Sequence, residues 1–248
     1  YGTSTLVMAK SGTQYLNCLS GQNIYGLTIN AGSTTHIRTI ETSGGNVYPR
    51  GPLVINGIMD SDKAAEINFG DNFTSAGTIT VGGSGSVDST PYYPIWRFTH
   101  TSGTISLPAI SLPKLLCQGS GGTTTLTGDL TATILLQVNS GHTFNANGNT
   151  IAVKYVDMNG GTLNLSNSTM IFNVTNSGDQ LDCNSASTIT TGNTTLTGHS
   201  SATKTSCIFP AAGDYEIVGD VKWLDIASGS DLTVIGAVVD CSMADSTA

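Results

Sequence analysis

Charged and aromatic side chains are scarce in this 248-residue sequence, at 10% and 6% of its residues. A typical globular domain carries about a quarter charged residues. The 9 Lys and Arg residues are scattered singly in a chain of net charge −8. We therefore expect no nucleic-acid partner, because no basic stripe is available to neutralise phosphates. No apolar run approaches the ~20 residues of a membrane helix, so we also expect no membrane span.

Recognisable catalytic and metal-binding motifs are missing as well. The sequence has no CxxC pair, no phosphate-binding loop and no Ser-His-Asp signature, and its 4 histidines have no partner at ligand spacing. We therefore expect no catalytic residues, no metal site and no cofactor. Asp60, Asp62 and Glu66 beside Lys63 are the nearest approach to an acidic cluster. Their spacing matches no calcium loop, and we interpret them as a solvated polar turn.

Small polar residues take the place of charge: the chain contains 36 Thr, 27 Ser, 18 Asn and 30 Gly. Such a composition also occurs in disordered chains, but those lack the apolar side chains needed to offset chain entropy. Here 38% of the residues are hydrophobic, many of them Val, Ile and Leu. The composition therefore predicts a folded protein.

Apolar and polar residues alternate between residues 151 and 174, and Asn-Gly-Gly and Ser-Asn-Ser corners interrupt the alternation. Leu163 and Leu165 stand at odd positions, whereas Met170 and Phe172 beyond the next corner stand at even positions. Period-two alternation predicts strands, and a change of phase across a corner means that the chain bends into a new strand. We expect strands of about five residues, with Asn and Gly at corners because they tolerate left-handed backbone angles.

The same order of apolar, polar and corner residues recurs along the chain, starting at Val138, Val156, Leu181 and Leu224. The last interval is about twice as long as the others, and we interpret it as two periods. The mean period is then roughly 21 residues, within the range of structural repeats. A degenerate repeat of this kind, built from short strands, is typical of a solenoid whose coils stack at ~4.8 Å.

The repeat predicts an all-β fold with a parallel β-helix over residues 117–248. Residues 1–116 are less regular, and we interpret them as an irregular β or capping region or as the first coils of the same solenoid, which would make one continuous domain. The alternative fold is an antiparallel β-sandwich or jelly roll, which also has alternating strands and frequent turns.

The consecutive segments VNSGHTFNANGNTIAV and VDMNGGTLNLSNSTMIF resemble the right-handed parallel β-helix (pectin-lyase-like) group, as in autotransporter adhesins and phage fibre or appendage proteins. The resemblance covers about residues 120–240. Some members of this group are polysaccharide lyases or hydrolases, for which the resemblance would imply an Asp-Asp pair, an Asn-Thr-Asp run or a Gly-His-Gly sequence. None of these occurs here.

We therefore expect a non-enzymatic structural protein located outside the cell, on the cell surface or on a virion. It would be a subunit of a fibre, appendage or surface filament that associates with itself as a homo-oligomer or polymer. The alternative is a carbohydrate-binding adhesin or a polysaccharide-degrading β-helix enzyme that contacts a cell-surface glycan through Tyr92, Tyr93 and Trp96. The competing interpretation of these aromatic residues is that they pack in the core or under a proline-rich loop.

Two kinds of covalent modification are also predicted. Cys183 and Cys207 are separated by close to one coil of chain, which would bring them within disulfide range. Packing of the cysteines as small buried hydrophobes is the alternative. Asn164 and Asn173 lie in glycosylation sequons at outward-facing strand positions.

Three acidic residues, Asp157, Asp182 and Asp225, share one place in the repeat. A ladder that binds cations or sugars is one interpretation of this shared position. We favour the other, in which these side chains cap corners by bonding the backbone.

Overall fold

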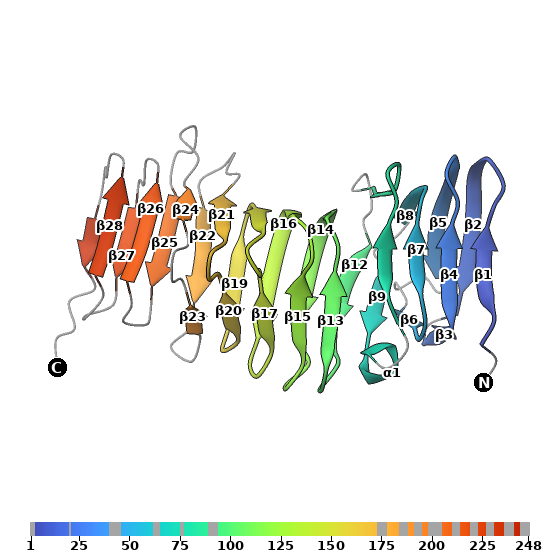
Figure 1. Ribbon diagram of the computed structural model, residues 1–248, viewed down its shortest axis with the longest axis horizontal. Coiled ribbons are helices and arrows are strands. Elements are labelled where there is room, and N and C mark those ends of the chain that lie inside the picture. Colours follow the sequence, from blue (N-terminus) through green and yellow to red (C-terminus); the bar gives the residue numbers. More distant parts are fainter. Residues whose placement is uncertain are drawn as a thin grey trace.

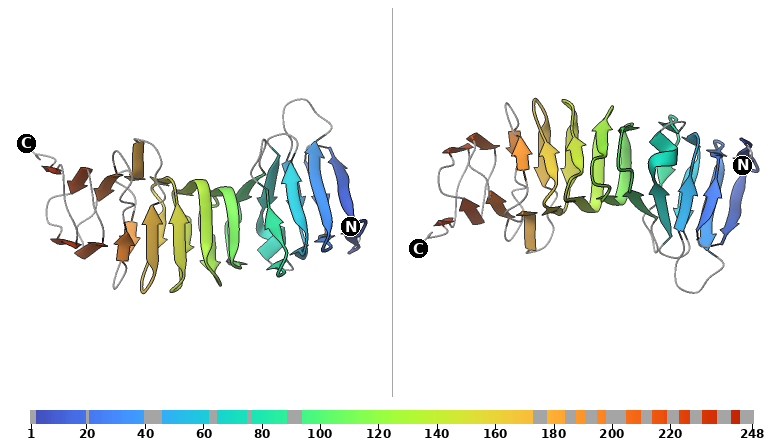
Figure 2. Two further views of the ribbon diagram at one scale, coloured as in Figure 1. Left: turned by 90° about the horizontal axis from the view of Figure 1, so that it is seen from above. Right: turned by 90° about the horizontal axis from the view of Figure 1, so that it is seen from below.

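The chain forms a rod of stacked coils in the computed structural model, and its first and last strands lie at opposite ends (Figures 1 and 2). The structure describes residues 3–19, 21–39, 46–61, 65–74, 77–88 and 94–172, and beyond 172 it describes the strands. Every pairing between these strands is parallel, and non-consecutive strands are neighbours in every sheet. The predicted all-β parallel solenoid is therefore confirmed, and the antiparallel alternative is wrong.

Three sheets surround the N-terminal part of the rod, and each coil contributes one strand to each of them. Sheet A consists of β1 (Thr5–Met8), β4 (Gly26–Ile29), β7 (Leu53–Ile55) and β10 (Ile79–Val81). Sheet B consists of β2 (Gly12–Cys18), β5 (Ser33–Thr39), β8 (Ile58–Ser61) and β11 (Ser86–Val87). Sheet C begins with β3 (Gln22–Ile24), β6 (Asn46–Pro49), β9 (Glu66–Phe69) and β12 (Ile95–Phe98).

Sheet C continues towards the C-terminus through two long strands, β14 (Ile110–Cys117) and β16 (Leu130–Asn139). It then divides into two rows of short strands. The first row is β18 (Thr150–Val153), β21 (Thr169–Phe172), β24 (Thr195–Thr197), β26 (Asp214–Val218) and β28 (Asp231–Ile235). The second row is β19 (Val156–Asn159), β22 (Gly178–Cys183), β25 (Thr205–Phe209), β27 (Trp223–Ile226) and β29 (Cys241–Met243).

A fourth sheet, sheet D, covers the middle of the rod. It consists of β13 (Thr104–Leu107), β15 (Thr123–Leu126), β17 (Thr143–Asn145), β20 (Thr162–Asn164) and β23 (Thr188–Thr190). The one described helix, α1 (Asp71–Thr74), lies between β9 and β10. Sheet C passes through the predicted boundary at residues 116–117, since β12 pairs with β14. The strands before residue 117 are therefore stacked as coils.

Partner positions on sheet C measure the length of each coil. Trp96 pairs with Leu115, Leu115 with Leu136 and Leu136 with Val156, so these three coils are nearly equal in length. Val156 then pairs with Leu181, as the repeat predicts.

The repeat also predicts that Val138 pairs with Val156, and this register is wrong. Val138 pairs with Met158, so the true register is shifted by one full inward–outward period of the strand. Such a shift leaves the same side chains facing inward, so the apolar pattern does not distinguish the two registers. Between Leu181 and Leu224, Cys207 pairs with both, and the long interval does hold two coils.

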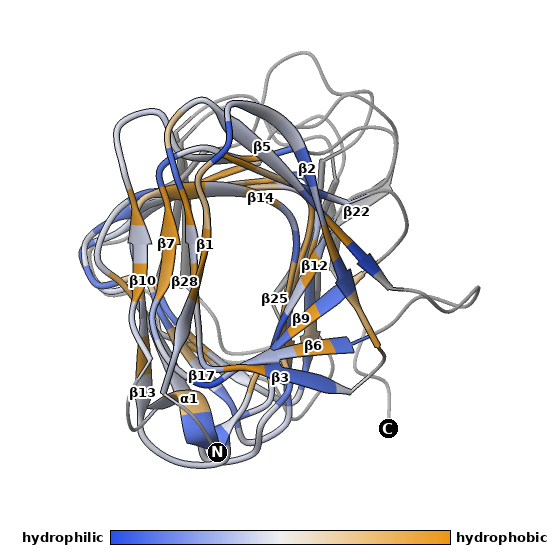
Figure 3. Ribbon diagram, turned by 90° about the vertical axis from the view of Figure 1, so that its right-hand side faces the viewer, coloured by the Kyte–Doolittle hydropathy of each residue, from blue (hydrophilic) through white to orange (hydrophobic). Residues whose placement is uncertain are grey.

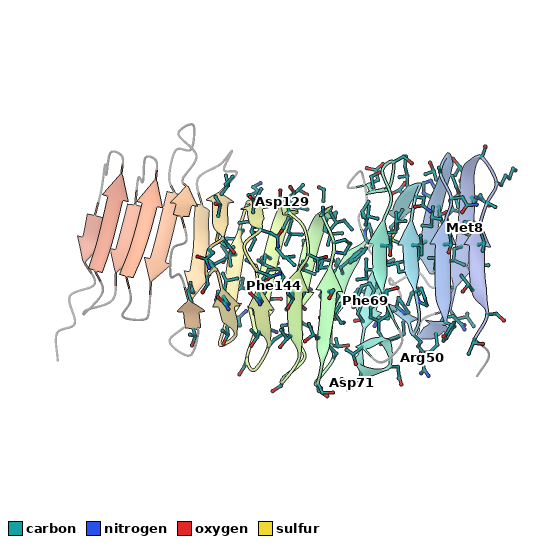
Figure 4. All side chains as sticks on the ribbon, viewed as in Figure 1. Met8, Arg50, Phe69, Asp71, Asp129 and Phe144 are labelled. Atoms are coloured by element: carbon teal, nitrogen blue, oxygen red, sulfur yellow. The ribbon has the colours of Figure 1, made fainter. Side chains whose placement is uncertain are left out.

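The interior is a narrow apolar core that extends along the described coils from Met8 to Met170. In the end-on view the strands enclose this interior (Figure 3). Phe69 is fully buried in it and contacts Phe73, Trp96 and Phe98 at ring-centroid distances of 4.9, 5.1 and 4.9 Å. Phe69 and Phe144 both point inward from their strands (Figure 4). Such ring pairs add about 0.5–1.5 kcal/mol each to the effect of burial.

Polar side chains at the corners tie one coil to the next. The Asp71 carboxylate accepts hydrogen bonds from the Thr101 amide at 2.5 Å and from its hydroxyl at 2.9 Å, and these bonds lower the pKa of Asp71. Asp129 accepts a bond from the Thr150 amide at 2.8 Å, and both aspartates lie at the edge of the ribbon (Figure 4). Asn147 has a left-handed φ of 52°, which confirms the expected use of Asn at a corner.

Candidate functional site

Two histidines lie inside the solenoid rather than on its surface. The rings of His100 and His142 are fully buried and meet edge to face, with centroids 5.1 Å apart. Nε2 of His142 is 3.0 Å from the Thr124 hydroxyl and Nδ1 is 3.0 Å from the Gly119 carbonyl oxygen. Burial lowers the pKa of both histidines, that of His142 to about 4. At neutral pH the pair is uncharged, and it has no access to an external substrate.

A row of polar side chains runs along the outer face of sheet C. Arg97 donates to Glu66, with Nη2 2.5 Å from Oε1, and it also donates to Gln118 on the other side. Gln118 Nε2 donates to Gln137 Oε1 at 3.4 Å, and Gln137 Nε2 donates to Asp157 Oδ2 at 2.8 Å. Each bond joins neighbouring coils, so this polar ladder clamps successive coils together from Glu66 to Asp157.

The polar ladder corrects the interpretation of Asp157. This residue lies within strand β19 and accepts a bond from a side chain of the preceding coil, so it does not cap a corner. Asp157 is in register with Asp182, as the repeat implies, whereas Ile208 lies between Asp182 and Asp225. The predicted column of three aspartates is therefore interrupted by an apolar residue.

A second polar group, the Tyr15 cluster, lies on the outer face of sheet B and contains Tyr15, His36, Arg38 and Asp60. The Arg38 guanidinium lies 3.6 Å from the centroid of the Tyr15 ring, and the His36 ring centroid lies 5.3 Å from it. His36 Nδ1 is 3.1 Å from Asp60 Oδ2. The nearby Ser61 hydroxyl is buried and donates to the Ile37 carbonyl oxygen, so it does not face this pair as a nucleophile.

Sequence reasoning missed the Tyr15 cluster because its members come from three different coils. The sequence spacing instead predicts a solvated turn that contains Asp60 and Glu66. In the structure Asp60 is buried against His36, and Glu66 pairs with Arg97 on sheet C. Asp62 and Lys63 lie outside the described residues. Within the described part of the chain, no group of three His, Cys, Asp or Glu side chains is placed to hold a metal ion.

Sheet D carries an outer face made only of small, uncharged polar residues. Thr104, Thr123, Thr143, Thr162 and Thr188 are in register as one column. The adjacent column consists of Ser106, Thr125, Asn145 and Asn164, and the backbone of Thr190 continues it in register. We call these two columns the threonine face.

The first coil exposes apolar side chains along an unpaired strand edge. Leu6, Val7, Tyr15 and Leu19 are 40%, 51%, 49% and 55% exposed, and the only other large exposed hydrophobic residue described is Ile58 at 36%. Strand β1 pairs with β4 on one side alone, and β2 pairs with β5 on one side alone. Among the described residues, the other edges of β1 and β2 have no partner strand, and such an edge can pair with a further strand.

The structure describes one of the three predicted aromatic glycan contacts, and this residue is not on the surface. Trp96 is fully buried beside Phe69, which agrees with the competing interpretation of core packing and removes this ring from a surface site. Tyr92 and Tyr93 lie outside the described residues. The exposed aromatic ring that the structure does show is that of Tyr15.

The predicted modification sites remain predictions. Cys207 pairs with Leu181 on sheet C, so a disulfide to Cys183 would cross the ladder diagonally, and both cysteine side chains lie outside what is described. Asn164 is half-buried and its Oδ1 accepts a bond from the Ser166 amide at 3.1 Å. Asn173 lies outside the described residues.

Cys18 and Cys117, by contrast, are free and buried. Burial raises the pKa of both thiols, that of Cys117 to about 12. These two cysteines pack as small hydrophobes, which was the alternative to pairing.

No helix in the described part of the chain is long and apolar enough to cross a membrane. Comparison with known proteins finds no matching family model, no matching curated protein and no matching solved structure.

Proposed function

We propose that this protein is a non-enzymatic structural subunit of an extracellular or virion fibre, appendage or surface filament, and that copies associate through the first coil. The observation that carries the proposal is the concentration of exposed apolar side chains at Leu6, Val7 and Leu19, beside unpaired strand edges. Burying such an edge against a second copy would remove apolar area from water and pair the free backbone groups.

The architecture supports the role of an extended structural element. One 16-stranded sheet extends from β3 to the C-terminal strands. The corner bonds from Asp71 and Asp129 and the polar ladder on sheet C join coils that lie next to each other. Since each coil is bonded to the next, such a solenoid extends as one rod and presents repeated outer faces.

A second copy is the occupant that fits the first coil best. A partner for β1 and β2 must itself offer a strand edge together with apolar side chains that match this end of the rod. The first coil of another copy offers the same strands and the same apolar residues. A two-fold contact of this kind is self-complementary and closes at a dimer, which would be the double-length unit from which the fibre is built. A glycan offers neither a strand edge nor a comparable apolar surface.

The oligomeric state tests the proposal. The double variant Val7→Lys/Leu19→Lys places two charges at the proposed contact, and Ile58→Lys, on an inner strand of sheet B, is the matched control. Light scattering after size exclusion should show wild type and the Ile58 variant as oligomers and the double variant as a monomer. Negative-stain images should show rods longer than one subunit for the first two. A monomeric wild type, or a double variant that associates normally, would contradict the proposal.

A glycan-binding adhesin is the second candidate, and the Tyr15 cluster is the observation that favours it. An exposed aromatic ring beside Arg38, His36 and Asp60 combines a stacking surface with hydrogen-bonding groups, which is the chemistry that sugars require. Binding to a glycan array should then be lost in Tyr15→Ala and kept in Tyr48→Ala on sheet C. Binding that is absent from wild type, or equal in both variants, would argue against this candidate.

A further inference from the structure

We propose that the threonine face of sheet D binds crystalline water, that is, the surface of ice. This inference goes beyond the proposed structural role and rests on a different surface. Figure 1 shows the strands of sheet D side by side along the middle of the rod. The face combines three properties: an unbroken periodic register, uncharged groups throughout, and a column of threonine hydroxyls that make no hydrogen bond within the described part of the chain.

The register of sheet D is regular over all its strands. Thr104 pairs with Thr123, Thr123 with Thr143, Thr143 with Thr162 and Thr162 with Thr188, with no bulge in any of these pairings. Sheet C, by contrast, has register irregularities between β14 and β16 and between β22 and β25. The outward side chains of sheet D therefore form a regular two-dimensional array. Their spacing is ~4.8 Å along the rod and ~6.7 Å along each strand.

The hydroxyls of the all-threonine column are available to a ligand. Those of Thr104, Thr123, Thr143 and Thr162 make no hydrogen bond within the part of the chain that the structure describes. The β-branched side chain has few χ1 rotamers, so neighbouring threonines in one column present methyl and hydroxyl groups in a similar orientation. Leu163 and Phe144 are buried on the inner side and hold the strands from below.

The dimensions of the threonine face match those of a water lattice. Water oxygens in ice are joined by hydrogen bonds of about 2.75 Å in a tetrahedral network, which places second neighbours about 4.5 Å apart and gives a perpendicular repeat of about 7.3 Å. The column of five threonines spans four intervals, so its mismatch with the lattice accumulates to about 0.6 Å on either side of Thr143. Small side-chain adjustments can absorb an offset of this size.

The chemistry of the face disfavours other periodic ligands. An ionic mineral needs rows of carboxylates or cations, and neither column contains a charged residue. A crystalline polysaccharide is bound chiefly by stacking on aromatic rings, and neither column contains one. Methyl and hydroxyl groups at lattice spacing suit a ligand that interacts only through hydrogen bonds and whose water molecules are already ordered.

Ice adsorption of the purified protein tests the inference. Wild type should shape ice crystals, inhibit ice recrystallisation and partition into a slowly growing ice hemisphere. Thr143→Lys at the centre of the face holds the lattice away, and it should raise the concentration needed for inhibition by about tenfold, equivalent to about 1.4 kcal/mol of adsorption energy. Thr123→Lys and Thr162→Lys, tested separately, should give the same loss, so that a folding defect in one variant does not obscure the result.

The matched control is Thr133→Lys, which introduces the same charge at an exposed threonine of β16 on another face. It should keep wild-type activity, and circular dichroism should show that all the variants remain folded. A wild type that is excluded from ice would overturn the inference, as would equal losses in the control and in the face variants. Binding to crystalline chitin or cellulose that depends on Thr143, without ice adsorption, would overturn it in favour of a polysaccharide ligand.

Discussion

The first coils and the middle coils of this rod have the same parallel architecture but very different outer faces. On sheet B, Tyr15, His36 and Asp60 are neighbours in register and differ in size, charge and chemistry. On sheet D the corresponding columns contain only Thr, Ser and Asn. One region therefore presents a local cluster, whereas the other presents a uniform lattice.

Coil length differs between the two regions in parallel with their outer faces. On sheet C, Gln22 pairs with Val47, Val47 with Ile67 and Ile67 with Trp96, and these three intervals are clearly unequal. The three coils that follow Trp96 are nearly equal in length. Coils of nearly constant length repeat the same local sequence at the same position of each turn, and columns of identical side chains result. Variable coils bring unlike residues together.

The aromatic core of the first region offers the largest effect with which to test this comparison. Phe69→Ala should lower the free energy of unfolding by about 4 kcal/mol, because it removes a fully buried ring and leaves a cavity. Phe144→Ala in the middle region is the comparison variant, and its cost should be smaller by about 1 kcal/mol since Phe69 also loses contacts with three rings. Urea unfolding followed by circular dichroism measures both, and equal losses would contradict the distinction.

The buried histidine pair should make the middle region sensitive to acid. The pKa of His142 is lowered to about 4 in the folded protein from its ordinary value near 6.5, so the unfolded chain binds the proton more readily. Stability should therefore fall as the pH drops from about 6.5 to 4, by about 3 kcal/mol, and level off below that range. Urea midpoints at a series of pH values measure the slope. His142→Asn should be less stable at pH 7 and show a shallower slope, and an unchanged slope would contradict this assignment.

The polar ladder on sheet C should contribute less than either core feature. Glu66 and Arg97 are each about a quarter exposed, so solvent screens their attraction. A double-mutant cycle with Glu66→Gln and Arg97→Met should give a coupling energy of about 0.5–1 kcal/mol, decreasing at high salt. A coupling near zero at low salt would mean that the ladder does not help to hold the coils in register.

The smallest expected effect concerns the corner at Asn147. Asn147→Gly tolerates the left-handed φ of 52° and should change the stability by only a few tenths of a kcal/mol, beyond the loss of the Nδ2 bond to the Leu126 carbonyl. Asn147→Ala should cost about 1–2 kcal/mol because a Cβ disfavours this conformation. Thermal melts of the two variants compare them directly, and an alanine variant as stable as the glycine variant would remove the backbone explanation.

Much of the fold was accessible from local patterns. Leu163 and Leu165 alternate with polar residues because one face of a strand is buried, and both are buried in the structure. The corner at Asn167 could be predicted because Asn tolerates left-handed backbone angles, and its φ is indeed left-handed. The repeat from Val156 to Leu181 was found because the same short strand recurs with the same corner.

The candidate sites were much harder to predict. The Tyr15 cluster and the polar ladder join residues that come from different coils, and no local pattern marks them as neighbours. Trp96 illustrates the opposite difficulty, since nothing near it in the sequence distinguishes a buried ring from an exposed one. The threonine face was visible as composition, but only the strand register shows that its members form two straight columns.

Alternation, corner residues and a recurring segment are local properties, and they are sufficient to determine that this chain winds into short parallel strands around an apolar interior. Which side chains meet across coils was settled by the three-dimensional packing. Coil length varies, and a slip by one full alternation keeps the apolar side chains inward, so the sequence pattern alone is compatible with more than one register. Hydrogen bonding between whole coils selects one of them, and with it the outer faces on which the proposed functions depend.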